Sequence, residues 1–206
     1  MVNTFLAHDL LWGMTPALLP ADAPGWVIDS ISAGQPVVVR RALSASGHIA
    51  VGVRGRLREQ RYATVVKVEA IERRVRPEEL CHVLIDRDVP ATRALHQLRP
   101  VLDNCGWVWG VSGSAGFELA SGIAALHEGS DLDLILRTPQ PLARARAQEL
   151  LRILDTVECA VDMQLQTPFG AVALREWAGS ARRVLLKNAH EACLVVDPWN
   201  PQEYAA

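Results

Sequence analysis

Three aspartates stand at spacings that could bring a metal ion and its ligands together. Asp131 and Asp133 lie in the stretch SDLDLILR, and Asp162 lies in AVDMQLQT. Both stretches alternate polar and apolar residues, which is typical of a strand with one buried face. Because side chains two positions apart share a face of a strand, we expect Asp131 and Asp133 to point the same way. If the two strands are neighbours, Asp162 is expected beside that pair.

Clustered carboxylates indicate a cation. Like charges at short range repel one another, and they remain ionised most easily when a cation joins them. Oxygen ligands favour Mg²⁺, which keeps several waters and takes further ligands from substrate phosphates. We therefore expect Asp131, Asp133 and Asp162 to be metal ligands and catalytic residues, with Mg²⁺ as the cofactor. The alternative is an ordinary strand whose aspartates simply face solvent.

A turn rich in glycine and serine precedes the first two aspartates. Gly113 leaves backbone N–H groups free to approach a phosphate, and Ser112 and Ser114 add hydroxyl groups. The helix expected next, GFELASGIAALH, would end at Gly129, and a helix N-terminus favours anions. Ser112, Gly113 and Ser114 are therefore candidate phosphate-binding residues. Seventeen positions separate Ser114 from Asp131, which predicts a long helix between turn and strand.

A basic stretch lies earlier in the chain. Residues 40–76 contain ten arginines and lysines against three glutamates. Arginine matches phosphate through its planar fork of donors, and a cationic patch also suits an acidic protein. In VVVRRA the neighbouring residues Arg40 and Arg41 point to opposite faces, so at most one should face a site, and we take Arg41 as the candidate. The alternative is a solvent-exposed hairpin surface.

The expected elements divide the chain into two parts. Residues 1–35 are rich in Pro, Gly and Ala and suggest short helices or loops, and residues 36–71 hold short β-branched runs typical of strands. The later part alternates strands and helices, as in GWVWGV, PLARARAQELLRIL and CLVVDPW. We predict an α/β (α+β) fold with a β-rich N-terminal domain, residues 1–88, and a domain with a mixed sheet, residues 89–206.

Composition narrows the class of protein. The chain has 206 residues, half of them hydrophobic, and a formal net charge of −2. A protein that coats nucleic acid non-specifically is therefore not expected. Its four cysteines form no CxxC pair, which argues against a zinc ribbon or a disulfide framework. No signal peptide and no membrane-spanning run is evident. A cytoplasmic protein without membrane or nucleic-acid partners is therefore expected.

Taken in order, these motifs resemble the nucleotidyltransferase superfold, whose signature is a GS turn, an hDxDh strand and a third carboxylate. More narrowly, the chain resembles the malonate decarboxylase holo-acyl-carrier-protein synthases, the phosphoribosyl-dephospho-CoA transferase family. That resemblance covers nearly the whole chain and rests on HDLLWG, VVVRRA, VGVRG, WGVSGSAGFELASG, HEGSDLDLILR, VDMQLQTPFGAVALREWA and VVDPW.

The resemblance implies a specific reaction. The substrates would be 2′-(5″-triphosphoribosyl)-3′-dephospho-CoA and the apo acyl-carrier subunit of malonate decarboxylase, and the prosthetic group would be joined to a carrier serine with release of diphosphate. Asp131 and Asp133 would hold the metal, and Asp162 would be a third ligand or the base. From its arginines, we expect the N-terminal domain to bind the carrier or the CoA arm. Two alternatives stay open: transfer of a nucleoside monophosphate from an NTP, and a non-catalytic nucleotide- or carrier-binding module.

Overall fold

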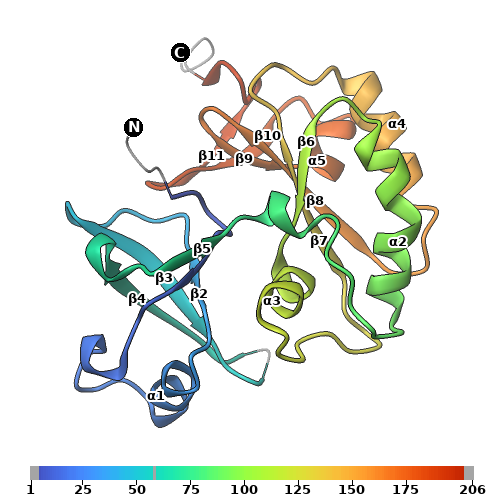
Figure 1. Ribbon diagram of the computed structural model, residues 1–206. Coiled ribbons are helices and arrows are strands. Elements are labelled where there is room, and N and C mark those ends of the chain that lie inside the picture. Colours follow the sequence, from blue (N-terminus) through green and yellow to red (C-terminus); the bar gives the residue numbers. More distant parts are fainter. Residues whose placement is uncertain (1–4, 58, 202–206) are drawn as a thin grey trace. The chain divides into compact units, whose positions relative to one another are not determined.

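The computed structural model describes residues 5–57 and 59–201, which fall into two compact units (Figure 1). The N-terminal unit runs to Arg76, and the C-terminal unit begins at Pro77. Residues 77–88, which the sequence analysis assigned to the first domain, therefore belong to the second unit.

Packing within the C-terminal unit explains where the chain divides. A short 3₁₀ helix, η3 (Pro77–Leu80), follows the division and lies against strand β6 (Val108–Val111). The approach is so close that a Cβ atom on Gly110 would stand 2.6 Å from the Pro77 carbonyl carbon. The buried Cys81 then donates a hydrogen bond from its Sγ to the Trp109 carbonyl oxygen at 3.2 Å. These contacts tie the segment to the second sheet.

The N-terminal unit is a sheet with one helix packed on it. Within the described residues its strand order is β4-β3-β2-β1-β5, and every pair is antiparallel. Its elements are β1 (Leu10–Trp12), η1 (Pro16–Leu18), α1 (Gly25–Ser32), β2 (Val37–Val39), β3 (His48–Arg54), β4 (Arg61–Lys67), η2 (Val68–Ala70) and β5 (Arg73–Val75). The strands at positions 37–67 match the predicted β-rich region, whereas β1 and β5 are too short to give a clear alternating pattern.

The C-terminal unit has a mixed sheet in the order β11-β10-β9-β8-β7-β6, in which β7 and β8 are parallel. Its remaining elements are α2 (Pro90–Asp103), α3 (Gly113–Ser121), β7 (Leu132–Arg137), α4 (Arg144–Leu154), β8 (Val161–Thr167), β9 (Gly170–Ala173), α5 (Leu174–Ala178), β10 (Val184–Lys187) and β11 (Ala192–Val195). Helices and a mixed sheet beside a smaller β-rich part confirm the predicted α+β fold class.

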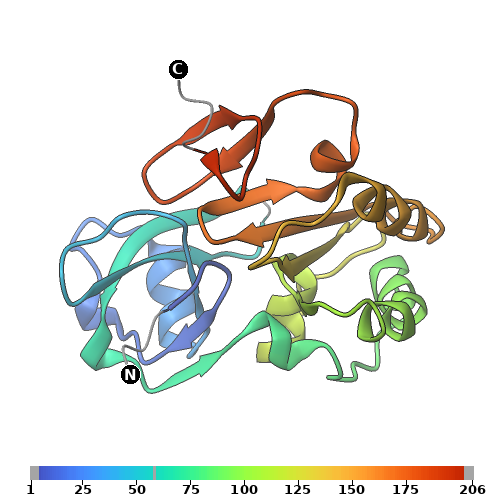
Figure 2. The same cartoon turned by 90° about the horizontal axis from the view of Figure 1, so that it is seen from above.

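Two helices cover one face of this sheet. Figures 1 and 2 show α2 and α4 on the same side of the strands. Leu98 and Leu102 of α2 and Leu154 of α4 are buried there. Pro100 lies inside α2, and the helix continues past it to Asp103. Leu102, half a turn after Pro100, is fully buried. Its packing offsets the loss of the backbone hydrogen bond that proline cannot donate.

No helix in the described part of the chain is long and apolar enough to span a membrane.

Candidate functional site

Two of the three predicted aspartates stand side by side on neighbouring strands. β7 and β8 are neighbours, as the sequence analysis supposed. They pair in parallel, and their register sets Asp133 directly opposite Asp162. Paired residues on adjacent strands share a face about 5 Å apart. The alternate residues Leu132 and Leu134 of β7 and Met163 of β8 are at most 2% exposed, so the aspartates lie on the face away from that apolar layer.

Asp131 occupies a different position from its expected partner. It precedes the first residue of β7 and is exposed, whereas Asp133 lies inside the strand and is half-buried. The charge of Asp131 also acts on Cys159. The pKa of this thiol is raised mainly by burial, and further by the charges of Glu158 and Asp131. The carboxylate pair on the sheet is therefore Asp133 with Asp162, and Asp131 stands at the entrance to the strand.

The glycine-serine turn lies directly against Asp133. Gly113 has a left-handed φ of +59°, and a Cβ atom on it would overlap the Asp133 carboxylate, with the Cγ atom only 2.5 Å away. Ser112 is buried, and its backbone N–H donates to the Asp133 carbonyl oxygen at 2.9 Å. Only glycine satisfies both the backbone angle and the close approach. Turn and aspartate, which are separated in the sequence, thus form one site.

The helix after the turn is shorter than predicted. α3 begins at Gly113 itself and ends at Ser121, where Gly122 adopts a left-handed φ of 72°. The sequence analysis expected a longer helix that ended at Gly129, but the left-handed Gly122 ends it one turn after Glu118. Residues 122–130 form a loop instead. Ser114 therefore sits in the first turn of α3, half-buried, where helical N–H groups have no partners within the helix.

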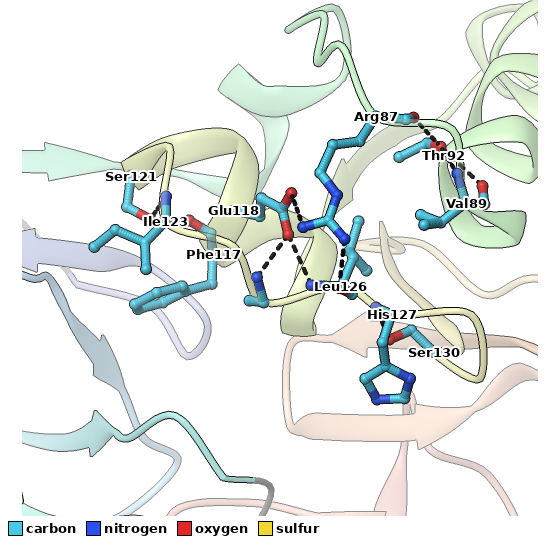
Figure 3. A network of polar contacts seen from close by, with 11 residues as sticks. Arg87, Val89, Thr92, Phe117, Glu118, Ser121, Ile123, Leu126, His127 and Ser130 are labelled. Atoms are coloured by element: carbon cyan, nitrogen blue, oxygen red, sulfur yellow. Dashed lines mark hydrogen bonds and ion pairs between the residues drawn. The ribbon is translucent and has the colours of Figure 1, made fainter.

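A buried glutamate holds that loop in place (Figure 3). Glu118 of α3 is 2% exposed, and its Oε2 accepts hydrogen bonds from the backbone N–H groups of Ala125 at 2.6 Å and Leu126 at 2.7 Å. Its Oε1 forms an ion pair with Arg87 at 3.1 Å, and Arg87 donates to the Leu126 carbonyl oxygen at 2.9 Å. This network fixes the path of the chain from α3 into β7 and so positions Asp133.

The donor set suits a hard divalent cation. Carboxylate oxygens on adjacent strands, beside a helix N-terminus, match the way Mg²⁺ is bound by one or two carboxylates together with phosphates and water. Among the described residues, no group of three or more acidic, histidine or cysteine side chains converges as a metal cluster. The strand register brings Asp133 and Asp162 together, and Asp131 as a further metal ligand stays a prediction.

One charged neighbour of the pair was missed in the sequence analysis. Arg175 of α5 is bound to Asp155, with Nη2 2.6 Å from Oδ1. This hydrogen bond, and after it the charges of Asp155 and Asp162, raise the pKa of Arg175. Its proximity to Asp162 depends on how α5 packs on β8, which no local sequence pattern reveals.

The last predicted contact residue lies in the other unit. Arg41 lies two residues after the end of β2 and is half-buried, while the aspartates and the turn belong to the C-terminal unit. Its contact with a substrate phosphate therefore stays a prediction.

Family models match both units of the chain. Residues 79–198 match the phosphoribosyl-dephospho-CoA transferase MdcG C-terminal domain, and residues 6–77 match the N-terminal domain of the same family. The chain belongs to the phosphoribosyl-dephospho-CoA transferase family. The resemblance inferred from the motifs, and with it the expectation of a transferase, is confirmed. The junction between the two matches also agrees with the division at Arg76 and Pro77.

Similar proteins match along all or nearly all of their length. A protein named phosphoribosyl-dephospho-CoA transferase from Pseudomonas fluorescens (strain Pf0-1) is 71% identical over 206 residues, which is 100% of both chains. Proteins with the same name from Pseudomonas aeruginosa and Azotobacter vinelandii are each 53% identical, covering 97% and 93% of this chain and 96% and 93% of their own. No solved structure matches.

Proposed function

We propose that this protein transfers the phosphoribosyl-dephospho-CoA group from 2′-(5″-triphosphoribosyl)-3′-dephospho-CoA to a serine of the apo acyl-carrier subunit of malonate decarboxylase, with release of diphosphate. One observation carries the proposal: in a chain of this family, the Asp133 carboxylate lies against the turn at Gly113 and beside Asp162. A metal-binding pair next to a phosphate-binding turn is what transfer from a triphosphate requires.

The chemistry is a displacement at phosphorus. The serine Oγ forms a bond to the α-phosphorus of the triphosphoribosyl group, the bond to the diphosphate oxygen breaks, and the serine proton passes to a base. Mg²⁺ held by Asp133 and Asp162 would neutralise charge on the triphosphate and on the departing diphosphate. Ser112, Gly113 and Ser114 would orient the phosphates through backbone N–H and hydroxyl groups.

Asp162 has two possible roles in this scheme. Its side chain is exposed, whereas that of Asp133 is half-buried against the turn. An exposed carboxylate beside the metal can accept the serine proton as well as bind the ion. We therefore assign Asp133 to metal binding and Asp162 to metal binding or proton acceptance.

The intact mass of the acceptor protein tests the proposal. Apo acyl-carrier subunit is incubated with the protein, Mg²⁺ and triphosphoribosyl-dephospho-CoA, and in parallel with each NTP in place of that donor. We expect a gain equal to the phosphoribosyl-dephospho-CoA arm, together with free diphosphate. A gain of one nucleoside monophosphate from an NTP, or no gain with either donor, would contradict the proposal.

A further inference from the structure

The sheet of the N-terminal unit has one covered face and one that carries charge. Its covered face packs against Val27 and Ile31 of α1 and consists of alternate strand residues, namely Leu11, Val37, Val39, Val51, Val53 and Val66. Because side chains alternate along a strand, the residues between these point to the opposite face. That opposite face is the subject of the inference.

The opposite face is basic where β3 and β4 form a hairpin. Register pairs Arg54 with Arg61, Ala50 with Val65, and His48 with Lys67. Arg40 joins them from the end of β2, since its Cδ atom would be 3.5 Å from a Cβ on Gly52. We call this surface the basic hairpin face, and its residues are Arg40, Arg54, Arg61, Val65 and Lys67. Neither β3 nor β4 contains an Asp or Glu.

Apolar and basic groups are exposed together there. Arg40, Arg61 and Lys67 are exposed, Val65 is 44% exposed, and Leu57 in the hairpin turn is 55% exposed. Arginine is enriched at protein interfaces and exposed apolar side chains contribute contact area there, whereas a site for a small anion needs no such apolar area. A flat strand surface also suits a macromolecule better than a phosphate.

Charge is distributed unevenly between the two units. Residues 1–76 contain ten basic and six acidic residues, whereas residues 77–206 contain eleven basic and seventeen acidic residues. Charged side chains on the edge strand β4 would also discourage strand pairing, but either sign would serve that purpose. β3 and β4 themselves carry only basic charged residues, although Lys67 is paired with Glu69 at 3.5 Å just beyond β4, and such a surface favours an acidic partner through electrostatic complementarity.

We propose that the basic hairpin face docks the protein acceptor of the transfer through an acidic surface on that acceptor. The inference rests on the proposed function and adds the surface and the charge of the partner. Its role is to bring the acceptor to the enzyme, so it affects acceptor binding and leaves donor binding and the chemical step unchanged.

Charge reversal tests the docking face. The full chain with Arg61→Glu and Lys67→Glu is compared with a matched control, Arg152→Glu and Arg183→Glu, which reverses two exposed charges in the C-terminal unit. Binding of the apo acyl-carrier subunit is measured by isothermal titration calorimetry, and KM values for acceptor and donor are measured by transfer. We expect the hairpin variant to raise the acceptor Kd and KM at least ~tenfold, with the donor KM and the control unchanged.

Three results would overturn the proposal. An acceptor Kd within twofold of the control excludes docking on this face. A rise in the donor KM instead would assign the face to substrate phosphates. Equal loss of binding to duplex DNA and to the acceptor would make the face a general polyanion surface. Calorimetry measures binding without turnover, so it tests the docking face even if the wild-type protein transfers nothing. Failure of transfer by the wild-type protein would instead refute the proposed function.

Discussion

At the scale of single residues, the position of the Asp133 carboxylate depends on Gly113. The Gly113 Cα faces the carboxylate so closely that no side chain fits between them, and its φ is in the left-handed region. The sequence predicted that a glycine was needed at the turn for access to phosphate. Its second function, which is to admit Asp133, depends on a contact between β7 and α3 and could not be read from spacing.

Gly113→Ala should therefore disable the site. Gly122 offers a matched control, because its φ of 72° is as strained for alanine but nothing lies within 4 Å of a Cβ there. Each substitution should lower the free energy of unfolding by ~1–2 kcal/mol through backbone strain. Only Gly113→Ala should also displace Asp133 and reduce transfer by about 10²-fold. The stability of both variants is measured by urea unfolding, so that transfer rates are compared between folded proteins. Equal transfer rates for the two variants would contradict the account.

The buried thiol of Cys81 leads to a separate prediction about how stability depends on pH. Burial raises the pKa of Cys81 to about 12 from an ordinary value of 9.0, with further increases from the charges of Asp103 and Glu78. A group whose pKa is raised in the folded state contributes its stability below its unfolded pKa and loses it as pH rises through the folded pKa. The protein should therefore lose stability between about pH 9 and pH 12, and the Cys81 thiol should resist alkylation at neutral pH.

Cys81→Ala is the control for the pH effect. Urea unfolding of the wild type and this variant at pH 8 and pH 10.5 separates Cys81 from other groups that titrate in the same range. We expect a smaller fall in the free energy of unfolding for Cys81→Ala. Parallel falls for both proteins would show that Cys81 contributes nothing to the pH dependence.

At the scale of elements, the loop of residues 122–130 sets where β7 begins. The sequence suggested a continuous helix because GFELASGIAALH has apolar residues at helical spacing. The left-handed Gly122 ends the helix, and Glu118 then satisfies the loop backbone from inside the unit. Glu118 looked like an ordinary helical residue in the sequence, since its partners Arg87 and Leu126 lie far from it along the chain.

Removing Glu118 should destabilise the C-terminal unit strongly. Glu118→Ala removes the acceptor of the buried Leu126 N–H and the half-buried Ala125 N–H, and it removes the ion-pair partner of Arg87, which should cost ~3–5 kcal/mol in the free energy of unfolding. The loss should be measured by urea unfolding beside Glu158→Gln, which breaks the exposed ion pair with Arg93 and should have a much smaller effect. If the two variants were equally stable, Glu118 would not be what holds the loop.

At the scale of the whole molecule, the alternation of strands and helices and a division into two parts could be predicted, but the position of the boundary could not. Alternating polar and apolar residues predicted β7 and β8. These strands are neighbours, as supposed, because parallel strands joined by one helix, here α4, are commonly adjacent. The boundary was placed too late, because the attachment of η3 to β6 depends on a close contact at Gly110. Asp131 was grouped with Asp133 by spacing, and its part in the site stays a prediction because it lies one residue before β7.

The measurement that tests the central claim most directly is the rate of acceptor modification by carboxylate variants, followed by intact mass. Asp133→Asn and Asp162→Asn should each lower the rate at least ~10³-fold without loss of fold, because each removes a charge on which the metal or the serine proton depends. Asp86→Asn, an exposed carboxylate on the loop before α2, is the control and should be normal. Transfer near the wild-type rate by folded Asp133→Asn or Asp162→Asn would contradict the account.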